Sequence, residues 1–488
     1  MNNIIFNPNY VVKPDKGRAL LLPSPFGRIS ETVVNGSEFI IHPVHAAILN
    51  AIHGKEYKQA VAEVASSLHV NHIFVEKFLL SLLDNKKFVR IKNSQTDNTY
   101  LFPPYTVITT DKTRARNKIP QSQFFNGEID LRMKRHLTPT NITLMLNNKC
   151  VTDCFYCYAD KRNPIECNIS LERLEELIIE ARNIHVNNFD VIGGEFFLYK
   201  NWEKLLYLLN QYGYHPYLST KVPLNEDVIK RLIKYNVTEL QISLDTLINE
   251  HLCSILNVGS SYIDKIKYTF GLLEKYNISI NVHTILTSRN DTIEDIKSVF
   301  NFINKLHNIN YWKLDIATPS LYKKESYNTI RPASDKIRQI NTFLSEIKDK
   351  TDFPVIYKET DNTTYFSTIN KDDKKKTFEN RARCSANYSG YFILPDGNVT
   401  ICEELYWHPN FLIGNVKEQG LLEIWNSEKA LDLFYLSQEK IKKDSKCSQC
   451  GIFEKCRSGK GVCWKAIIGF YGFDKWDYPD PLCVENVE

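Results

Sequence analysis

The residues with the clearest chemical potential are three cysteines in one short loop. Cys150, Cys154 and Cys157 are spaced as CxxxCxxC directly after the strand-like run Ile142–Leu146. Cysteine thiolates hold iron–sulfur clusters, so three of them on one loop can bind three irons of a 4Fe–4S cubane. Since a cubane has four irons, one would remain open to a small molecule. A zinc loop is the alternative, but zinc sites usually pair cysteines as CxxC with further ligands well downstream.

A second group of cysteines is concentrated near the C-terminus. Its seven members are Cys384, Cys402, Cys447, Cys450, Cys456, Cys463 and Cys483. A zinc ribbon could use the four from Cys447 to Cys463, but it would leave the other three unexplained. Cys167 and Cys253 lie outside these groups and are expected to be buried thiols.

The elements that must position the first loop alternate between strand and helix from about residue 138 to 318. Helical stretches such as Leu171–Ile184 and Ile263–Tyr276 separate the strands. Six such units predict an α/β fold with a parallel sheet, curved into a partial (β/α)6 TIM-like barrel. In such barrels the chemistry lies at the C-terminal ends of the strands. The predicted strands are Ile142–Leu146, Asp190–Ile192, Pro216–Ser219, Glu239–Leu244, Ser279–Leu286 and Trp312–Ile316.

Polar residues at these strand ends complete a recognisable pattern. The cysteine loop, followed by Gly193-Gly194-Glu195 after the second strand, resembles the radical S-adenosylmethionine (SAM) superfamily. In that family the open iron chelates the amino and carboxylate groups of SAM, and an aromatic residue, here Tyr156, precedes the last cysteine. The resemblance implies that the Gly-Gly-Glu segment binds the SAM amino group, its glycines letting the backbone approach closely. Phe196 departs from the proline that commonly follows.

Three further positions are assigned to SAM binding less directly, and one nearby histidine is not assigned to it. Ser243 and Asp245, at the end of the fourth strand, resemble the ribose-contacting segment of the family. Thr220 is a weaker SAM contact, because a capping hydroxyl would explain it equally well. His283 lies within the fifth strand and is expected to be a packed or hydrogen-bonded residue rather than a base.

The C-terminal cysteines resemble the signature of SPASM domains, which carry two auxiliary 4Fe–4S clusters beside a radical SAM core. The resemblance implies an outer cluster on Cys447, Cys450, Cys456 and Cys483, and an inner cluster on Cys384, Cys402 and Cys463. One spacing departs from the family, since six residues separate Cys456 from Cys463 where three are usual. The glycine-containing loop 457–462 could absorb this insertion. No fourth cysteine serves the inner cluster, which predicts an open iron or a non-cysteine ligand.

The first hundred residues are expected to form a separate winged-helix-like domain. They lack a concentrated basic recognition helix, so nucleic acid is not the expected partner. The segment is similar to precursor-recognition domains of peptide-modifying enzymes, which add a leader peptide as an extra strand. A plain structural domain is the alternative. The predicted elements are strands at 10–12, 19–22 and 88–91, and helices at 43–52, 57–68 and from Asn71, with Phe74, Phe78, Leu79 and Leu82 on one face.

The domain boundaries follow from these patterns. Residues 1–100 form the recognition domain, 101–137 a connector with a Lys-Arg cluster, and 138–330 the radical SAM core. Residues 331–383 form a bridging segment, and 384–488 the SPASM domain. The charge run at 371–376 is expected to be a solvated linker.

Composition sets the cellular context. The 488 residues carry a formal net charge of +4, which is too slight to argue for nucleic acid or a membrane surface. The chain shows neither a signal peptide nor a spanning apolar run. A cytoplasmic protein is therefore expected, in which twelve cysteines favour metal ligation over disulfides.

Together these features predict a radical SAM/SPASM oxidoreductase that modifies a ribosomally made (RiPP) precursor peptide. Reduction of the SAM-bound cluster would give a 5′-deoxyadenosyl radical, and the substrate radical would close a thioether or carbon–carbon crosslink. An electron donor such as flavodoxin or ferredoxin is implied. The alternatives are an anaerobic sulfatase-type maturase that forms formylglycine, a peptide epimerase, and a non-catalytic iron–sulfur scaffold.

Overall fold

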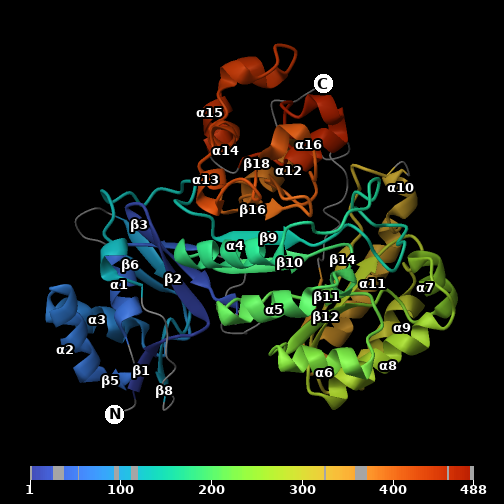
Figure 1. Cartoon of the computed structure of the whole chain (residues 1–488), viewed down its shortest axis with the longest axis horizontal. Helices are drawn as coiled ribbons and strands as arrows, with labels where there is room; N and C mark the ends of the chain where they lie inside the picture. The colour runs from blue at the N-terminus through green and yellow to red at the C-terminus, as the bar shows by residue number, and fades with distance from the viewer. Residues whose placement is uncertain are drawn as a thin grey trace. The chain divides into compact units, whose positions relative to one another are not determined.

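The computed structural model describes residues 3–25, 38–52, 54–92, 98–110, 119–323, 326–357, 371–458 and 461–483. The chain divides into two compact units (Figure 1). One comprises Met1–Asn141 with Arg182–Asn188, and the other comprises Ile142–Ala181 with Phe189–Glu488. Within the described ranges, none of the helices has the length and apolarity needed to cross a membrane.

In its described residues, the first unit contains three α-helices and several short antiparallel strand pairs. Its sheets have the orders β2-β3-β4, β5-β1-β8 and β6-β7. The three predicted helices are present, and the predicted final strand pairs as β6 with β7. The elements are β1 (Asn3–Phe6), β2 (Tyr10–Asp15), β3 (Arg18–Pro23), β4 (Phe39–Ile41), α1 (Pro43–Ala51), β5 (Lys55–Glu56), α2 (Tyr57–Leu68), α3 (His72–Leu82), β6 (Val89–Lys92), β7 (Thr99–Phe102) and β8 (Val107–Thr110).

Residues 99–110, which the sequence analysis assigned largely to a connector, belong to the core of this unit. Phe102 and Val107 are completely buried. Pro103 and Pro104 separate β7 from β8. They interrupt the alternation of apolar and polar residues by which the two strands could have been predicted, since proline is rarely found inside strands. The Lys-Arg cluster within 112–118 lies outside the described residues.

A histidine lies at the centre of the aromatic core of the first unit. His45 is 4% exposed, and its ring stacks on Phe78 at 4.5 Å and on Phe74 at 5.9 Å between centroids. Burial, helped by the neighbouring His42, lowers the pKa of His45 to about 3. Phe74 itself is 40% exposed, so the buried face of α3 contains Val75 in its place.

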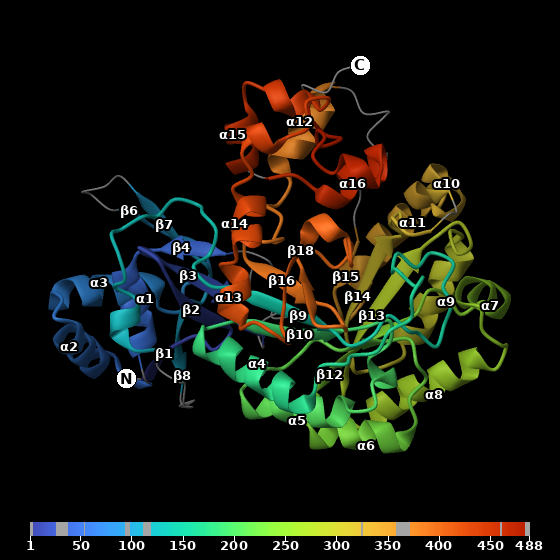
Figure 2. The same cartoon turned by 45° about the horizontal axis from the view of Figure 1, so that its top comes forward.

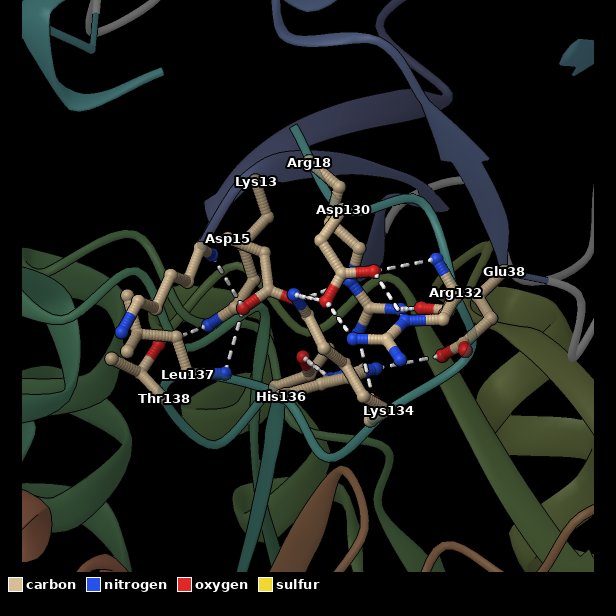
Figure 3. Close-up of polar contacts among 12 residues, drawn as sticks. Lys13, Asp15, Arg18, Glu38, Asp130, Arg132, Lys134, His136, Leu137 and Thr138 are labelled. Carbon is tan, nitrogen blue, oxygen red and sulfur yellow. Dashed lines mark hydrogen bonds and ion pairs between the residues drawn. The ribbon is translucent and has the colours of Figure 1, made fainter. Parts of the chain in front are cut away.

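Buried charges tie the β2–β3 hairpin to distant backbone of the same unit (Figure 3). The Arg18 guanidinium pairs with Asp15 at 2.7 Å and donates to the carbonyls of Arg132 and Lys134 at 2.6 and 2.8 Å. Asp15 also accepts from Leu137 N at 2.7 Å. These bonds fix the segment that leads into β9.

Lys13 makes the second half of this attachment. Its ammonium group donates to Thr138 Oγ1 at 2.6 Å and to the carbonyls of Pro139, His185 and Ile184 at 2.9, 3.0 and 3.4 Å. The hairpin therefore holds the chain just before β9, which begins at Asn141, and just before β10, which begins at Asn188.

The second unit begins with the barrel. Strands β11 to β15 are parallel and hydrogen-bonded in chain order. The strands are β9 (Asn141–Met145), β10 (Asn188–Ile192), β11 (Ser219–Thr220), β12 (Glu239–Ser243), β13 (Ser279–Leu286), β14 (Ile309–Ile316) and β15 (Val355–Ile356). The helices are α4 (Leu171–Asn183), α5 (Trp202–Gln211), α6 (Glu226–Lys234), α7 (Asn249–Leu256), α8 (Tyr262–Lys275), α9 (Ile293–Ile303), α10 (Tyr327–Ile330) and α11 (Ser334–Ile347).

These strands confirm the α/β fold predicted from the alternation, with two local differences. The third strand, predicted at Pro216–Ser219, is the two-residue β11, since a proline cannot donate to the ladder. Beyond the sixth predicted strand, α11 and β15 add one more edge strand to the parallel sheet.

The C-terminal part continues the sheet of the first two barrel strands. The order β10-β9-β16-β17-β18 places the three later strands beside the start of the barrel (Figure 2). The charge run at 371–376 is helical, in α12, with mostly exposed side chains. The remaining elements are α12 (Lys371–Asn380), β16 (Gly390–Ile393), β17 (Asn398–Thr400), β18 (Leu412–Asn415), α13 (Leu421–Trp425), α14 (Glu428–Phe434), α15 (Phe453–Ser458) and α16 (Trp464–Tyr471).

Candidate active site

The three cysteines of the first loop follow β9 and are held by side-chain and backbone bonds. The Thr152 hydroxyl lies 3.4 Å from the Cys150 sulfur and 3.3 Å from the Cys154 sulfur. Cys157 N donates to Cys154 O at 3.0 Å. Lys323 Nζ also donates to the Cys154 carbonyl, at 3.0 Å. The loop thus has a fixed shape that turns its thiols toward one space.

The Gly-Gly-Glu segment is joined to the cysteine loop through Asn147. Gly194 N donates to Asn147 O at 2.7 Å, and Asn147 Nδ2 donates to Glu195 O at 2.9 Å. A Cβ atom on Gly194 would lie 2.0 Å from the carbonyl oxygen of Lys149, whereas one on Gly193 would come no closer than 3.3 Å to its nearest neighbour. Gly194 is therefore required by the close approach of two protein loops.

The carboxylate of Glu195 is buried and already oriented. The Thr220 hydroxyl lies 2.9 Å from both carboxylate oxygens and shares its one hydrogen between them. Phe197 N and Lys221 N also donate to the carboxylate, at 3.2 and 3.3 Å. Burial raises the pKa of Glu195, although these donors oppose the shift. Thr220 thus positions Glu195, and its oxygen also accepts from Val222 N at 2.8 Å, as a capping hydroxyl does.

A second buried network joins Tyr156, which precedes Cys157, to Asp245, which follows β12. Tyr156 OH donates to Asp245 Oδ2 at 2.7 Å, and Lys221 Nζ lies 3.2 Å from the same oxygen. The Lys221 ammonium also lies over the Tyr156 ring, 5.4 Å from its centroid. Burial alone would lower the pKa of Lys221, but Asp245 and the thiolate of Cys154 raise it. Sequence reasoning missed Lys221, whose only signal was its place after a strand end.

These groups surround a cavity of about 760 Å³, within the range of ligand sites. Of the residues predicted to hold SAM or its cluster, all except Asp245 line it; Asp245 is buried and bonded to Tyr156 and Lys221. Glu403 and Tyr406, which follow Cys402, also line it. Burial and the neighbouring Glu404 raise the pKa of Glu403 to about 7.

Cys384 lies close enough to Cys402 and Cys463, the other two cysteines predicted for the inner cluster, for its charge to act on both. Burial, with a smaller contribution from the charge of Cys384, raises the pKa of both Cys402 and Cys463. Cys463 N donates to Asp480 Oδ2 at 3.0 Å, and Arg381 pairs with the same carboxylate oxygen at 2.8 Å. The three thiols therefore share one neighbourhood and fit a common cluster.

The outer set is grouped in a separate small core. Cys447 and Cys450 pack against a cluster of buried apolar side chains that includes Phe453. Burial raises the pKa of Cys456 to about 11, with contributions from Cys483 and Cys447. Residues 459 and 460 of the inserted loop lie outside the described residues.

None of the twelve cysteines forms a disulfide. Within the described ranges, no three His, Cys, Asp or Glu side chains lie close enough to hold one metal ion. In a cubane each cysteine binds a different iron, so the sulfurs stand wider apart than around a single zinc. Cys167 and Cys253 are half-buried and outside both sets.

Comparisons with known proteins agree with this layout. Residues 144–303 match the family model of the radical SAM superfamily, and residues 384–451 match that of SPASM, an iron–sulfur cluster-binding domain. The crystal structure of Streptococcus suis SuiB bound to precursor peptide SuiA superposes with a TM-score of 0.64 at 16% identity, covering 98% of this chain and 99% of that one. The SuiB structure bound to S-adenosylmethionine gives 0.63 at 14%, with the same coverage. At this identity the likeness concerns the fold.

Curated relatives match shorter stretches of the chain. GTP 3′,8-cyclase of Clostridium perfringens is 25% identical over 150 residues, 30% of this chain and 46% of the cyclase. The chain thus spans about half the length of that relative. A protein of Methanocaldococcus jannaschii, MJ0907, is 25% identical over 217 residues, 42% of this chain and 71% of MJ0907.

Proposed function

Because this chain carries a radical SAM domain followed by a SPASM domain, we propose that it is a peptide maturase that installs a thioether or carbon–carbon crosslink in a ribosomally made precursor. The observation that carries the proposal is a cavity of about 760 Å³ that the SAM-type motifs line together with Glu403 and Tyr406, which follow the auxiliary cysteine Cys402. A substrate side chain in this cavity would lie near both the radical source and an electron acceptor.

The residues present fit the groups that this function needs. Cys150, Cys154 and Cys157 would hold the SAM-binding 4Fe–4S cluster, which when bound supplies the reductive cleavage of SAM to methionine and a 5′-deoxyadenosyl radical. Two auxiliary clusters would occupy the inner and outer cysteine sets. Thiolates placed close together repel one another, and nearby cations offset that charge.

The chain supplies those cations and the SAM contacts itself. The thiolates of the loop raise the pKa of Lys161, although burial opposes the shift, and Lys221 stands beside Cys154 in the same way. Glu195 presents a buried carboxylate that suits an ammonium group of SAM. Asp245, held by Tyr156 and Lys221, fixes the end of β12 beside Ser243, the proposed ribose contact.

The proposed partner is a precursor peptide recognised by residues 1–100. The similarity of fold to SuiB over 98% of this chain, and the existence of a SuiB structure with its precursor peptide, support this assignment. In the first unit, β4 ends the order β2-β3-β4, and an end strand offers backbone groups to an extended peptide. A flavodoxin or ferredoxin is the proposed electron donor.

The decisive test replaces Cys150, Cys154 and Cys157 together with Ala in anaerobically reconstituted enzyme. Reductive cleavage of SAM, measured as 5′-deoxyadenosine, should be abolished, because no thiolate remains to hold the SAM-binding iron. Wild-type enzyme and the peptide encoded nearest its gene should give a product lighter by two hydrogens. Continued cleavage by the variant, or a formylglycine product from the wild type, would contradict the proposal.

A further inference from the structure

A cluster of titratable side chains lines the cavity and belongs to none of the motifs assigned above to SAM or to the clusters. His283 on β13 and Asp315 on β14 both line the cavity, and His283 Nε2 lies 3.0 Å from Asp315 Oδ2. Lys313 Nζ lies 2.6 Å from the same oxygen. His283 pairs in register with Ser243 of β12 on one side and with Lys313 on the other. The cluster is thus level with the proposed ribose contact and faces the same space.

The pairing decides which nitrogen of His283 is available. An ionised carboxylate only accepts hydrogen bonds, so Nε2 carries the proton that points to Asp315. In the neutral form of the ring, Nδ1 then presents a lone pair, and the described residues show no hydrogen-bond partner for this atom. Burial alone would raise the pKa of Asp315, but the bonds from His283 and Lys313 hold it well below its usual range. The carboxylate therefore stays ionised and keeps the ring oriented, as in other His–Asp pairs.

The proposed crosslink requires such a group. Joining two residues removes two hydrogens overall, the first as a hydrogen atom taken by the SAM-derived radical. When the carbon radical bonds to the partner atom, the partner's X–H bond breaks and releases one proton and one electron. An oxidised auxiliary cluster, held by the C-terminal cysteines, would supply the acceptor for the electron. The proton also needs an acceptor, which a base in the cavity would provide.

We infer that His283 Nδ1 is the proton acceptor in crosslink formation and that Asp315 is its positioning residue. The inference rests on the proposed function. The other basic groups of the cavity are engaged, since Lys221 is paired with Asp245 and Glu195 accepts from Thr220. Lys161 and Lys313 are also paired with carboxylates, and Glu403, which lines the cavity as well, is the competitor to test.

The experiment uses reconstituted holoenzyme, SAM and the precursor peptide, and measures 5′-deoxyadenosine and crosslinked peptide separately. His283→Gln retains an amide donor for Asp315 but no base, so SAM cleavage should persist while crosslinking falls by about 10²-fold. In His283→Ala, added imidazole should restore crosslinking. Asp315→Asn should lower kcat with little change in KM.

The matched control is His251→Gln. His251 Nδ1 pairs with Asp295 Oδ1 at 2.8 Å, which is the same kind of pair outside the cavity lining, and this variant should crosslink normally. Crosslinking at the wild-type rate in His283→Gln would overturn the inference, as would loss of SAM cleavage and crosslinking together without imidazole rescue. So would the same phenotype in Glu403→Gln alone. A wild-type enzyme that cleaves SAM but crosslinks no peptide would instead overturn the proposed function, and this inference with it.

Discussion

At the scale of single residues, burial decides the chemistry of several ionisable groups. His45 illustrates the effect outside the active site. Its ring lies inside an aromatic core, where a charge would be poorly solvated. The folded-state pKa of about 3 compares with an ordinary value of 6.5. The unfolded chain therefore binds a proton between these two pH values, and the folded chain does not.

The first unit should consequently lose stability as the pH falls from about 6.5 toward 3. His45→Phe keeps an aromatic ring but cannot titrate, so the free energy of unfolding of this variant should depend less on pH over that range. Urea unfolding at several pH values measures the difference. His72→Gln, at an exposed position on α3, is the control and should retain the wild-type slope. An unchanged slope in His45→Phe would show that other groups dominate.

At the scale of elements, the site depends on contacts between loops at neighbouring strand ends. The clearest example is the approach of the Gly-Gly-Glu segment to the residue before Cys150. The predicted clash at Gly194 is with backbone, including the Lys149 carbonyl carbon at 2.5 Å. Backbone in a bonded loop cannot move aside as a flexible side chain can.

Gly194→Ala should therefore displace the cysteine loop, at a cost of about 1 to 3 kcal/mol, and reduce iron retention and SAM cleavage together. Gly193→Ala provides a matched comparison, because the nearest atom to its added Cβ is 3.3 Å away. Iron content after reconstitution and 5′-deoxyadenosine formation are the measurements. Equal behaviour of the two variants would mean that the loops adjust without cost.

The arrangement of strands and loops also explains which parts of the site could be predicted from the sequence. The cysteine loop and the Gly-Gly-Glu segment were evident because their spacing is local. Lys221 and the His283–Asp315 pair were not, since their meaning depends on which strand faces turn inward and on the register between β13 and β14. Likewise, nothing local in the sequence indicates that β16 pairs with β9, because most of the barrel lies between these two strands along the chain.

At the scale of the whole molecule, the barrel strands were predicted well because alternating strands and helices dictate a parallel sheet. The short β7 and β8 were missed since two prolines obscure their pattern. Beyond the sixth strand, β15 contains only two residues, too few for any periodicity to be visible. Tertiary pairing, rather than local preference, creates such elements.

Cofactor content is the whole-molecule property that tests the cysteine assignments. Three cubanes predict about twelve irons per chain after anaerobic reconstitution. Replacing Cys447 and Cys450 with Ala should remove about four of them while leaving SAM cleavage, which depends on the barrel loop. Iron and zinc analysis is the measurement. About four irons with stoichiometric zinc in the wild type would contradict the assignment of two auxiliary clusters.

The buried hairpin of Figure 3 has a consequence for engineering. Lys13, Asp15 and Arg18 belong to the first hundred residues, yet the groups they bind lie at 132–139 and 184–185. A cut at residue 100 would strip five backbone carbonyls and one amide of their partners, just ahead of the two strands that carry the SAM motifs. The first hundred residues therefore cannot be removed or exchanged as an independent unit. Chimeras that exchange the first hundred residues between enzymes should take the β2–β3 hairpin and the segments at 132–139 and 184–185 from the same enzyme.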